Sequence, residues 1–285
     1  MVESISSSDG AVSFSFGSNY GLHFPSSWMS STTDGLLPYH TEIEDAFFGG
    51  FWLATSTVIF TIVLEIFSFR TVRNLCRQQR HGVQLYQKAL WVNFFNHYIL
   101  GVPVYMIAET LFCQSTAEPR WKNSSVGLAI QTLLLTFLHN AMYYYVHEQM
   151  HSSPTKYQYH KFHHQFRLHV PPMAANAVSI VEYLVAYVLP FGVAALVLRP
   201  DVRALQTSIG ILSFLNLVVH TPRLRDTYYG ATMVPSWMVS TEDHLTHHEK
   251  LNCHYASPVF NIDWMVKQLF PRRKLANDKK QGEGS

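Results

Sequence analysis

Five long apolar stretches limit what this chain can fold into. They cover residues 46–69, 89–113, 126–146, 177–198 and 204–220, and each is about long enough to cross the roughly 30 Å hydrocarbon core of a bilayer as a helix. A helix satisfies all backbone hydrogen bonds within one such segment. Only 14% of the 285 residues are charged, against about 25% in soluble domains. The sequence therefore predicts an all-α fold, a multi-pass membrane helical bundle of about four to five spans.

Basic residues are distributed asymmetrically. No Lys or Arg precedes Arg70, and Arg73, Arg77 and Arg80 follow it closely. Positively charged loops stay on the cytosolic side of a membrane, so we expect the N-terminus on the lumenal side and the C-terminus in the cytosol. The Asn123-Ser-Ser sequon would then lie in a lumenal loop, where glycosylation is permitted. No stripe of basic charge of the kind that binds nucleic acid is present.

Composition divides the chain into four parts. Residues 1–45 are polar and Ser-rich and are expected to form a mobile tail with little regular structure. Residues 46–125 hold the first two spans and their loops. Residues 126–270 hold the remaining spans together with the histidine motifs described next, and residues 271–285 form a basic C-terminal tail.

Histidine is concentrated in three motifs. Twelve of the sixteen histidines lie between positions 139 and 254. The motifs are one HxxxH and two HxxHH boxes, formed by His147 and His151, by His160, His163 and His164, and by His244, His247 and His248. Side chains three and four residues apart share one face of a helix, so the imidazoles of each box can converge. Burying eight imidazoles without a shared partner would cost about 1–3 kcal/mol for each unsatisfied group. Because imidazole is the commonest metal ligand, the boxes predict a metal site.

The number and location of these histidines indicate which metal chemistry is expected. The last two spans form a hairpin, kinked near Pro190 and Gly192, which returns the third box to the cytosolic side where the first two lie. More histidines than one ion can bind indicate two ions close together. Zinc and copper also bind imidazole well, so ligand type does not identify the metal. Lipids without electrophilic groups require oxygen activation, which zinc cannot supply. We therefore expect two iron ions and dioxygen.

Three other interpretations of the boxes remain open. His147-Glu-Gln-Met-His151 matches HExxH, in which Glu148 would be the general base of a zinc metalloprotease, although this leaves six box histidines unexplained. Glu148-Gln-Met-His151 also matches the ExxH of ferritin-like di-iron proteins, but the second ExxH that they need is missing. Histidines line ion paths in transporters, but these boxes follow a span and do not lie within one.

In this order the motifs HEQMH, HKFHH and HLTHH, with a hydrophobic hairpin before the third, resemble those of the fatty acid hydroxylase and sterol desaturase superfamily. The resemblance covers roughly residues 130–265. It implies a non-haem di-iron, O2-dependent oxidoreductase of the endoplasmic reticulum membrane with a catalytic domain at 126–270. It also implies a lipid substrate, and electrons that come indirectly from NAD(P)H through cytochrome b5 and its reductase.

The resemblance also implies a set of metal ligands. They are the eight box histidines together with His220, which ends the hairpin: His147, His151, His160, His163, His164, His220, His244, His247 and His248. Members of the superfamily often have a further HxxxH at the position of Asn216-Leu-Val-Val-His220, where this chain has only one histidine. A tenth ligand would therefore come from Asn216, His139, His169 or His254.

Departures from the superfamily pattern affect the choice of substrate. Ser179-Ile-Val-Glu182 stands where sterol desaturases have HPxE, and the residues after the last box do not follow the usual short run to a Trp-Asp pair. These differences suggest a divergent branch, such as the one that epoxidises squalene. We favour oxidation of squalene to 2,3-epoxysqualene. The alternatives are sterol C4-methyl oxidation, sterol C5 desaturation and fatty acyl hydroxylation.

Several other residues are candidates for supporting roles. Glu148 is the predicted catalytic residue, and Glu148, Glu182 and Asp243 are candidates for fixing imidazole tautomers, or else are cap and surface charges. Aromatic residues such as Phe137 and those at 143–145 would line an apolar substrate channel, or else pack ordinarily. One face of the second span carries three polar residues, for which hydrogen bonding between helices is the simplest role: Asn93, Asn96 and His97.

Overall fold

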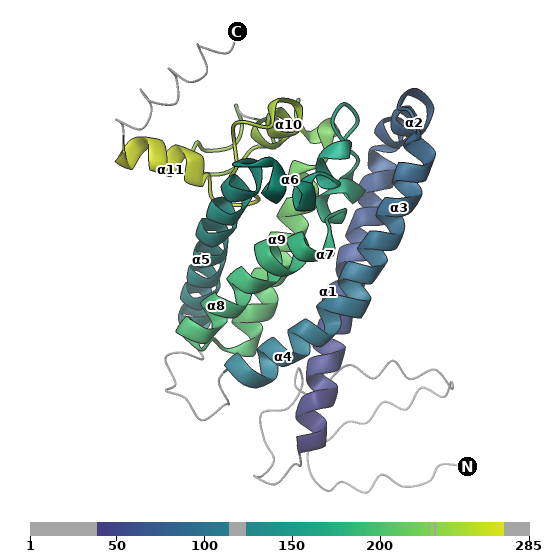
Figure 1. Cartoon of the computed structure of the whole chain (residues 1–285). Coiled ribbons are helices and arrows are strands. Elements are labelled where there is room, and N and C mark those ends of the chain that lie inside the picture. Colours follow the sequence, from purple (N-terminus) through teal and green to yellow (C-terminus); the bar gives the residue numbers. More distant parts are fainter. Residues whose placement is uncertain (1–38, 114–123, 228, 231, 271–285) are drawn as a thin grey trace, which may run out of the picture. The chain divides into compact units, whose positions relative to one another are not determined.

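The computed structural model describes residues 39–113, 124–227, 229–230 and 232–270, all within the unit Pro38–Ser285. In these residues the regular elements are helices (Figure 1). Four helical segments are long and apolar enough to cross a membrane, namely Ile43–Phe67, Ser125–His151, Ile180–Leu198 and Val202–Val219. The prediction of an all-α multi-pass membrane protein is therefore confirmed.

The first helix extends further toward the N-terminus than the sequence suggested. Helix α1 covers Tyr39–Phe67, so the last part of the predicted mobile tail is helical. Residues 1–38, the basic tail 271–285 and the sequon at Asn123 lie outside the described residues. The amphipathic helix α2 (Phe69–Gln78) follows α1 and carries three of the four arginines of the predicted cytosolic loop.

Two predicted spans contain a π-helical stretch directly before a proline. The predicted second span, which is not among the four segments above, consists of α3 (Gly82–Phe94), the π-helical η2 (Phe95–Gly101) and α4 (Val102–Phe112), whose second residue is Pro103. The fourth span has the same order, with α7 (Ile180–Glu182), the π-helical η5 (Tyr183–Val188) and α8 (Leu189–Leu198), which begins Leu189-Pro190. Proline has no N–H and crowds the preceding turn, so the wider π turns accommodate it.

The spans pack so that the ends of α5 and α9 meet. Helix α5 (Ser125–His151) contacts α8 and α9 (Val202–Val219), while α1 contacts α4 and α9. Figure 1 shows the shorter helices α6 (Pro154–His160) and α10 (Thr241–Lys250) at the end of the bundle where α5 and α9 finish, with α11 (Ile262–Leu269) beside them. This arrangement places the segments that carry the histidine motifs together.

The short 3₁₀ segment η4 (Pro172–Asn176) is held by polar side chains from the surrounding spans. The Glu65 carboxylate of α1 accepts hydrogen bonds from the Met173 N–H at 2.7 Å and from the Tyr86 hydroxyl at 3.1 Å. Asn93 Nδ2 donates to the Met173 carbonyl at 3.2 Å, and Asn96 Nδ2 donates to the Val178 carbonyl at 3.0 Å. Both asparagines therefore have the interhelical hydrogen-bonding role expected of them, with this segment as their partner.

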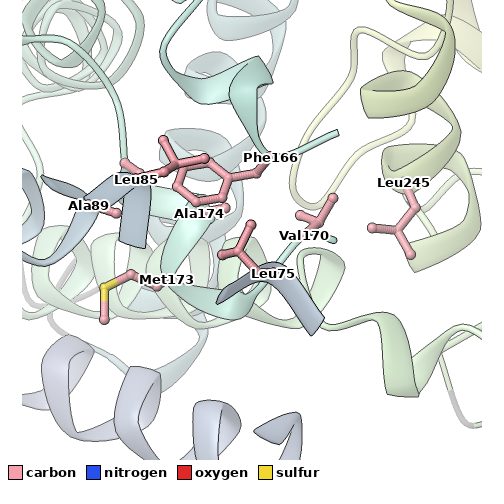
Figure 2. Close-up of a cluster of buried hydrophobic side chains, with 9 residues drawn as sticks. Leu75, Leu85, Ala89, Phe166, Val170, Met173, Ala174 and Leu245 are labelled. Carbon is pink, nitrogen blue, oxygen red and sulfur yellow. The ribbon is translucent and has the colours of Figure 1, made fainter. Parts of the chain in front are cut away.

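A buried apolar cluster packs the same segment against the extramembrane helices. Figure 2 shows side chains from α2, α3, the loop around η4 and α10 in one cluster: Leu75, Leu85, Ala89, Phe166, Val170, Met173, Ala174 and Leu245. Burying each large side chain contributes about 1.5–3 kcal/mol. The cluster therefore joins the second and third histidine boxes to the bundle.

Candidate metal centre

The structure gathers histidines from four elements, together with His220, into two groups. Helix α5 carries His147 and His151, α6 ends at His160, the 3₁₀ turn η3 (His163–Gln165) follows, and α10 carries the third box. His220 comes directly after α9. One group contains His147, His151, His160, His164 and His247, and the other contains His163, His220, His244 and His248. All are buried except His151, which is half-buried.

Distances within each group fit ligands around one ion. In the five-histidine group, Nε2 of His160 lies 2.9 Å from Nε2 of His147 and 2.8 Å from Nε2 of His164. In the four-histidine group, Nε2 of His220 lies 2.9 Å from Nε2 of His244 and 3.3 Å from Nε2 of His248. A metal–nitrogen bond of about 2.1 Å would put neighbouring ligands about 3.0 Å apart at a right angle and about 3.4 Å apart at the tetrahedral angle. The spacing of the imidazoles therefore fits metal coordination in both groups.

Backbone carbonyls orient several of these rings. The Nδ1–H of His147 donates to the Tyr255 carbonyl at 2.8 Å, and that of His247 donates to the Cys253 carbonyl at 2.7 Å. His163 and His220 donate in the same way to the carbonyls of Ala174 and Asn216, at 3.0 and 2.7 Å. A ring that donates through Nδ1 and is neutral carries its lone pair on Nε2. These four rings are therefore fixed in the tautomer that a metal ligand needs.

Glu182 has the corresponding role at His160. Its Oε1 lies 2.6 Å from His160 Nδ1, and both side chains are 1% exposed. Ser179 is the N-cap of α7, and its hydroxyl accepts the Glu182 N–H at 3.1 Å, which fixes the start of the helix that carries the carboxylate. The Ser-Ile-Val-Glu segment thus keeps a glutamate beside the histidines although it lacks the HP of the HPxE pattern.

Burial keeps the imidazoles of the extramembrane boxes neutral. Desolvation lowers the pKa of His220 to about 4, and it lowers the pKa values of His160, His163, His244 and His247 well below the usual range, with neighbouring imidazoles adding to the effect. Neutral rings would place several Nε2 lone pairs against one another at about the closest distance two nitrogens allow. A bound cation turns this repulsion into coordination, so the chemistry of the donor set fits two metal ions.

Other residues singled out in the sequence lie in different surroundings. Among the described residues, none donates a hydrogen bond to Glu148, which is half-buried and forms no ion pair with a histidine. Asp243 forms a capping box with Ser240 at the start of α10 and lies 3.4 Å from His254 Nδ1. Of the three carboxylates considered, Glu182 is therefore the one in contact with a grouped histidine.

The candidates for a tenth ligand are outside both groups. His139 is buried on α5 against the Phe191 ring, with centroids 4.2 Å apart. His169 is half-buried, and His254 pairs with Asp243. Asn216 donates through Nδ2 to the Ala175 carbonyl at 3.1 Å, so its side chain holds η4.

A cavity of about 320 Å³ lies among α1, η2, α4, η4, η5, α8 and α9. Most of its lining is apolar, as expected of a lipid channel, but the aromatic side chains are not the ones predicted. Tyr183, Tyr187 and Phe191 line it, whereas Phe137 packs on Phe260 with ring centroids 5.5 Å apart. The aromatic residues at 143–145 are also absent from the lining. The sequence identified aromatic residues near the first box but did not indicate which helices surround the cavity.

The segment after the third box has a role that sequence reasoning missed. Its carbonyls at Cys253 and Tyr255 accept from histidines of two different boxes. The segment is held in turn by Asn140 Oδ1, which accepts the N–H groups of Val259 and Phe260, both at 3.0 Å. Backbone acceptors carry no signal in a residue pattern. The unusual length of the run after the box was the only sign available.

Comparison with known proteins gives one match. Residues 132–268 match the family described as Fatty acid hydroxylase, and this segment contains all nine grouped histidines. The same comparisons found no match among curated proteins or solved structures.

Proposed function

Because residues 132–268 place this chain in the fatty acid hydroxylase family of di-iron oxidoreductases, we propose that it is a membrane-bound, O2-dependent monooxygenase that oxidises a lipid. The observation that carries the proposal is the pair of buried all-histidine groups, whose ring nitrogens lie at the spacing of ligands around an ion. The lipid substrate follows from the family and from the mostly apolar cavity within the spans.

We assign the five-histidine group to one iron ion and the four-histidine group to the other. When bound, the two ions supply the redox chemistry by which one atom of dioxygen enters the lipid and the other leaves as water, with two electrons from an external donor. The chain's own residues orient the imidazoles through the carbonyls of Ala174, Cys253, Tyr255 and Asn216. Glu182 does the same for His160. Burial of the rings excludes bulk water, which would otherwise compete with the lipid.

The finer assignment rests on the sequence. Divergence around the second and third boxes favours epoxidation of squalene to 2,3-epoxysqualene, ahead of sterol C4-methyl oxidation, sterol C5 desaturation and fatty acyl hydroxylation. The proposed location is the endoplasmic reticulum membrane, with the boxes on the cytosolic side together with the arginines of α2. Electrons would reach the site from NAD(P)H through cytochrome b5 and its reductase or a similar donor.

One variant in each histidine group tests the proposal. His163→Ala and His247→Ala each remove one imidazole, from the four- and the five-histidine group respectively. Both should lose O2-dependent lipid oxidation in microsomes supplied with NADPH, while membrane insertion remains that of the wild type. Retained turnover in either variant would refute the ligand assignment.

Metal analysis of the purified full chain separates the proposal from an intramembrane HExxH protease. We expect two irons per chain and consumption of oxygen when squalene, a methylsterol or an acyl lipid is oxidised. A protease would contain one zinc, depend on Glu148 as its general base and act without oxygen. A single zinc and oxygen-independent peptide cleavage would favour that alternative.

A further inference from the structure

The cavity between the spans has one end close to the histidines. Along α9 its lining includes Leu205, Ile209 and Ser213. At a rise of about 1.5 Å per residue, Ser213 lies about 10 Å before His220 and Leu205 about 22 Å before it. The cavity therefore extends away from the histidine groups into the apolar part of the bundle, and Leu205 marks its far end.

Two polar side chains line the near end. Asn176 comes two residues after Ala174, whose carbonyl accepts from His163. His97, on η2, lines the same cavity, and its neighbour Asn96 donates to the Val178 carbonyl at 3.0 Å. Both residues are therefore at the end nearest the proposed metal centre.

Each of these side chains has a buried polar atom without a partner. Nε2 of His97 and Nδ2 of Asn176 make no hydrogen bond within the described part of the chain. The Tyr105 hydroxyl, farther along the cavity, also makes no hydrogen bond in the described residues, but unlike the other two it has the side chains of Gln206 and Glu109 beside it. A buried donor or acceptor left unpaired destabilises the protein. Because both residues line the cavity, a ligand held there satisfies these two atoms when the imidazole and the amide turn toward it.

We propose that the lipid held in this cavity carries one uncharged oxygen, as a hydroxyl or a carbonyl, which hydrogen-bonds to His97 Nε2 and Asn176 Nδ2. The hydrocarbon part of the lipid extends past Ser213 toward Leu205. Within the lipid, this oxygen atom is then close to the carbon atom that is oxidised. This inference rests on the proposed function, because it takes the near end of the cavity as the place where the reacting end of the lipid is held.

The lining disfavours two other kinds of ligand. Among the residues that the structure describes, it contains no Lys or Arg side chain to pair with a carboxylate, so a free fatty acid is a poor fit. A pure hydrocarbon such as squalene would leave both polar atoms unpaired. Among the substrates considered above, the cavity therefore favours a sterol or another oxygen-bearing lipid, against the preference drawn from the boxes.

Equilibrium binding to the purified full chain tests the proposal without requiring turnover. The probes are radiolabelled matched pairs: a methylsterol and its 3-deoxy analogue, and a long-chain alcohol and the alkane of equal length. We expect the oxygen-bearing member of at least one pair to bind about tenfold to a hundredfold more tightly. In His97→Leu and Asn176→Leu this preference should fall to about threefold or less, while the oxygen-free member binds as well as before.

His139→Leu is the matched control. It removes a second buried imidazole that also has an unpartnered Nε2, but His139 does not line the cavity. The preference should survive in this variant. Equal binding of both members of both pairs by the wild-type chain, or a preference that persists in both cavity variants, would overturn the inference. If the purified chain contains no iron but still binds the oxygen-bearing member of a pair more tightly, that result would count against the proposed function and would still support this binding site.

Discussion

Replacing Glu182 with alanine should weaken iron binding without removing any proposed ligand. The Glu182 carboxylate contacts His160 Nδ1 at 2.6 Å, and both side chains are 1% exposed. A hydrogen bond to a charged group contributes about 1.5–3 kcal/mol, and its loss leaves the Nδ1–H buried without an acceptor. At about 1.4 kcal/mol per factor of ten, this corresponds to iron affinity lower by about tenfold to a hundredfold. Carboxylates that hold metal-bound histidines have effects of this size.

The assay is an anaerobic titration of the metal-free full chain with ferrous ion against a competing chelator, alongside thermal unfolding of the metal-free protein. Glu182→Gln keeps an oxygen that can accept from His160, so it should recover part of the affinity lost in Glu182→Ala. Glu148→Ala is the control. Glu148 makes no hydrogen bond to a histidine in the described residues, and its removal should leave iron affinity within about threefold of the wild type.

The reasoning fails if Glu182→Ala binds iron as tightly as the wild type. It also fails if Glu148→Ala weakens binding equally, because Glu148 would then be the carboxylate that supports the site. That second outcome would revive the original prediction of Glu148 as the catalytic residue.

Three further changes have defined outcomes. Asn140→Leu leaves two buried N–H groups without their acceptor and should destabilise the chain by about 2–4 kcal/mol, seen as a lower unfolding temperature and faster hydrogen exchange at residues 259–260. Ser240→Ala removes the hydroxyl that accepts the Asp243 N–H at the start of α10 and donates to the Asp243 carboxylate, and it should cost about 1 kcal/mol in thermal unfolding, with iron content unchanged. Gly101→Ala places a methyl group 2.8 Å from the Tyr183 hydroxyl and 3.0 Å from the Asn96 carbonyl oxygen, so the Tyr183 ring must shift. Because Gly101 and Tyr183 both line the cavity, KM for the lipid should rise severalfold while iron content is kept.

The histidine pattern predicted residues that the structure does bring together, although the helical geometry assumed for the boxes holds for only two of the three. His147 and His151 do lie one turn apart on α5, and the third box does lie on α10. The second box is not one continuous helix, because α6 ends at His160 and a 3₁₀ turn begins at His163. The boxes can meet if the hairpin returns the third box to the side of the membrane where the first two lie. This depends on the number of spans between the second and third boxes, which hydropathy indicates well.

Other features could not be predicted because they depend on tertiary contacts. Asn93, Asn96 and His97 have the same spacing as any polar helix face, yet the first two hold η4 and the third lines the cavity. The π-helical stretches before Pro103 and Pro190 shift the register of the residues around them. A period of 3.6 residues therefore does not hold along the whole length of either segment.

The acceptors at Cys253 and Tyr255 bear on when this protein becomes competent during its synthesis. His147 is translated more than a hundred residues before the Tyr255 carbonyl that fixes its ring, and His247 is fixed by a carbonyl that follows it. A nascent chain that stops just after Lys250 contains all nine histidines but lacks the backbone that orients rings of the first and third boxes. The metals therefore have an organised place to enter only after Tyr255 has been made, so termination between Lys250 and Tyr255 would yield a chain with every ligand and little capacity to retain iron.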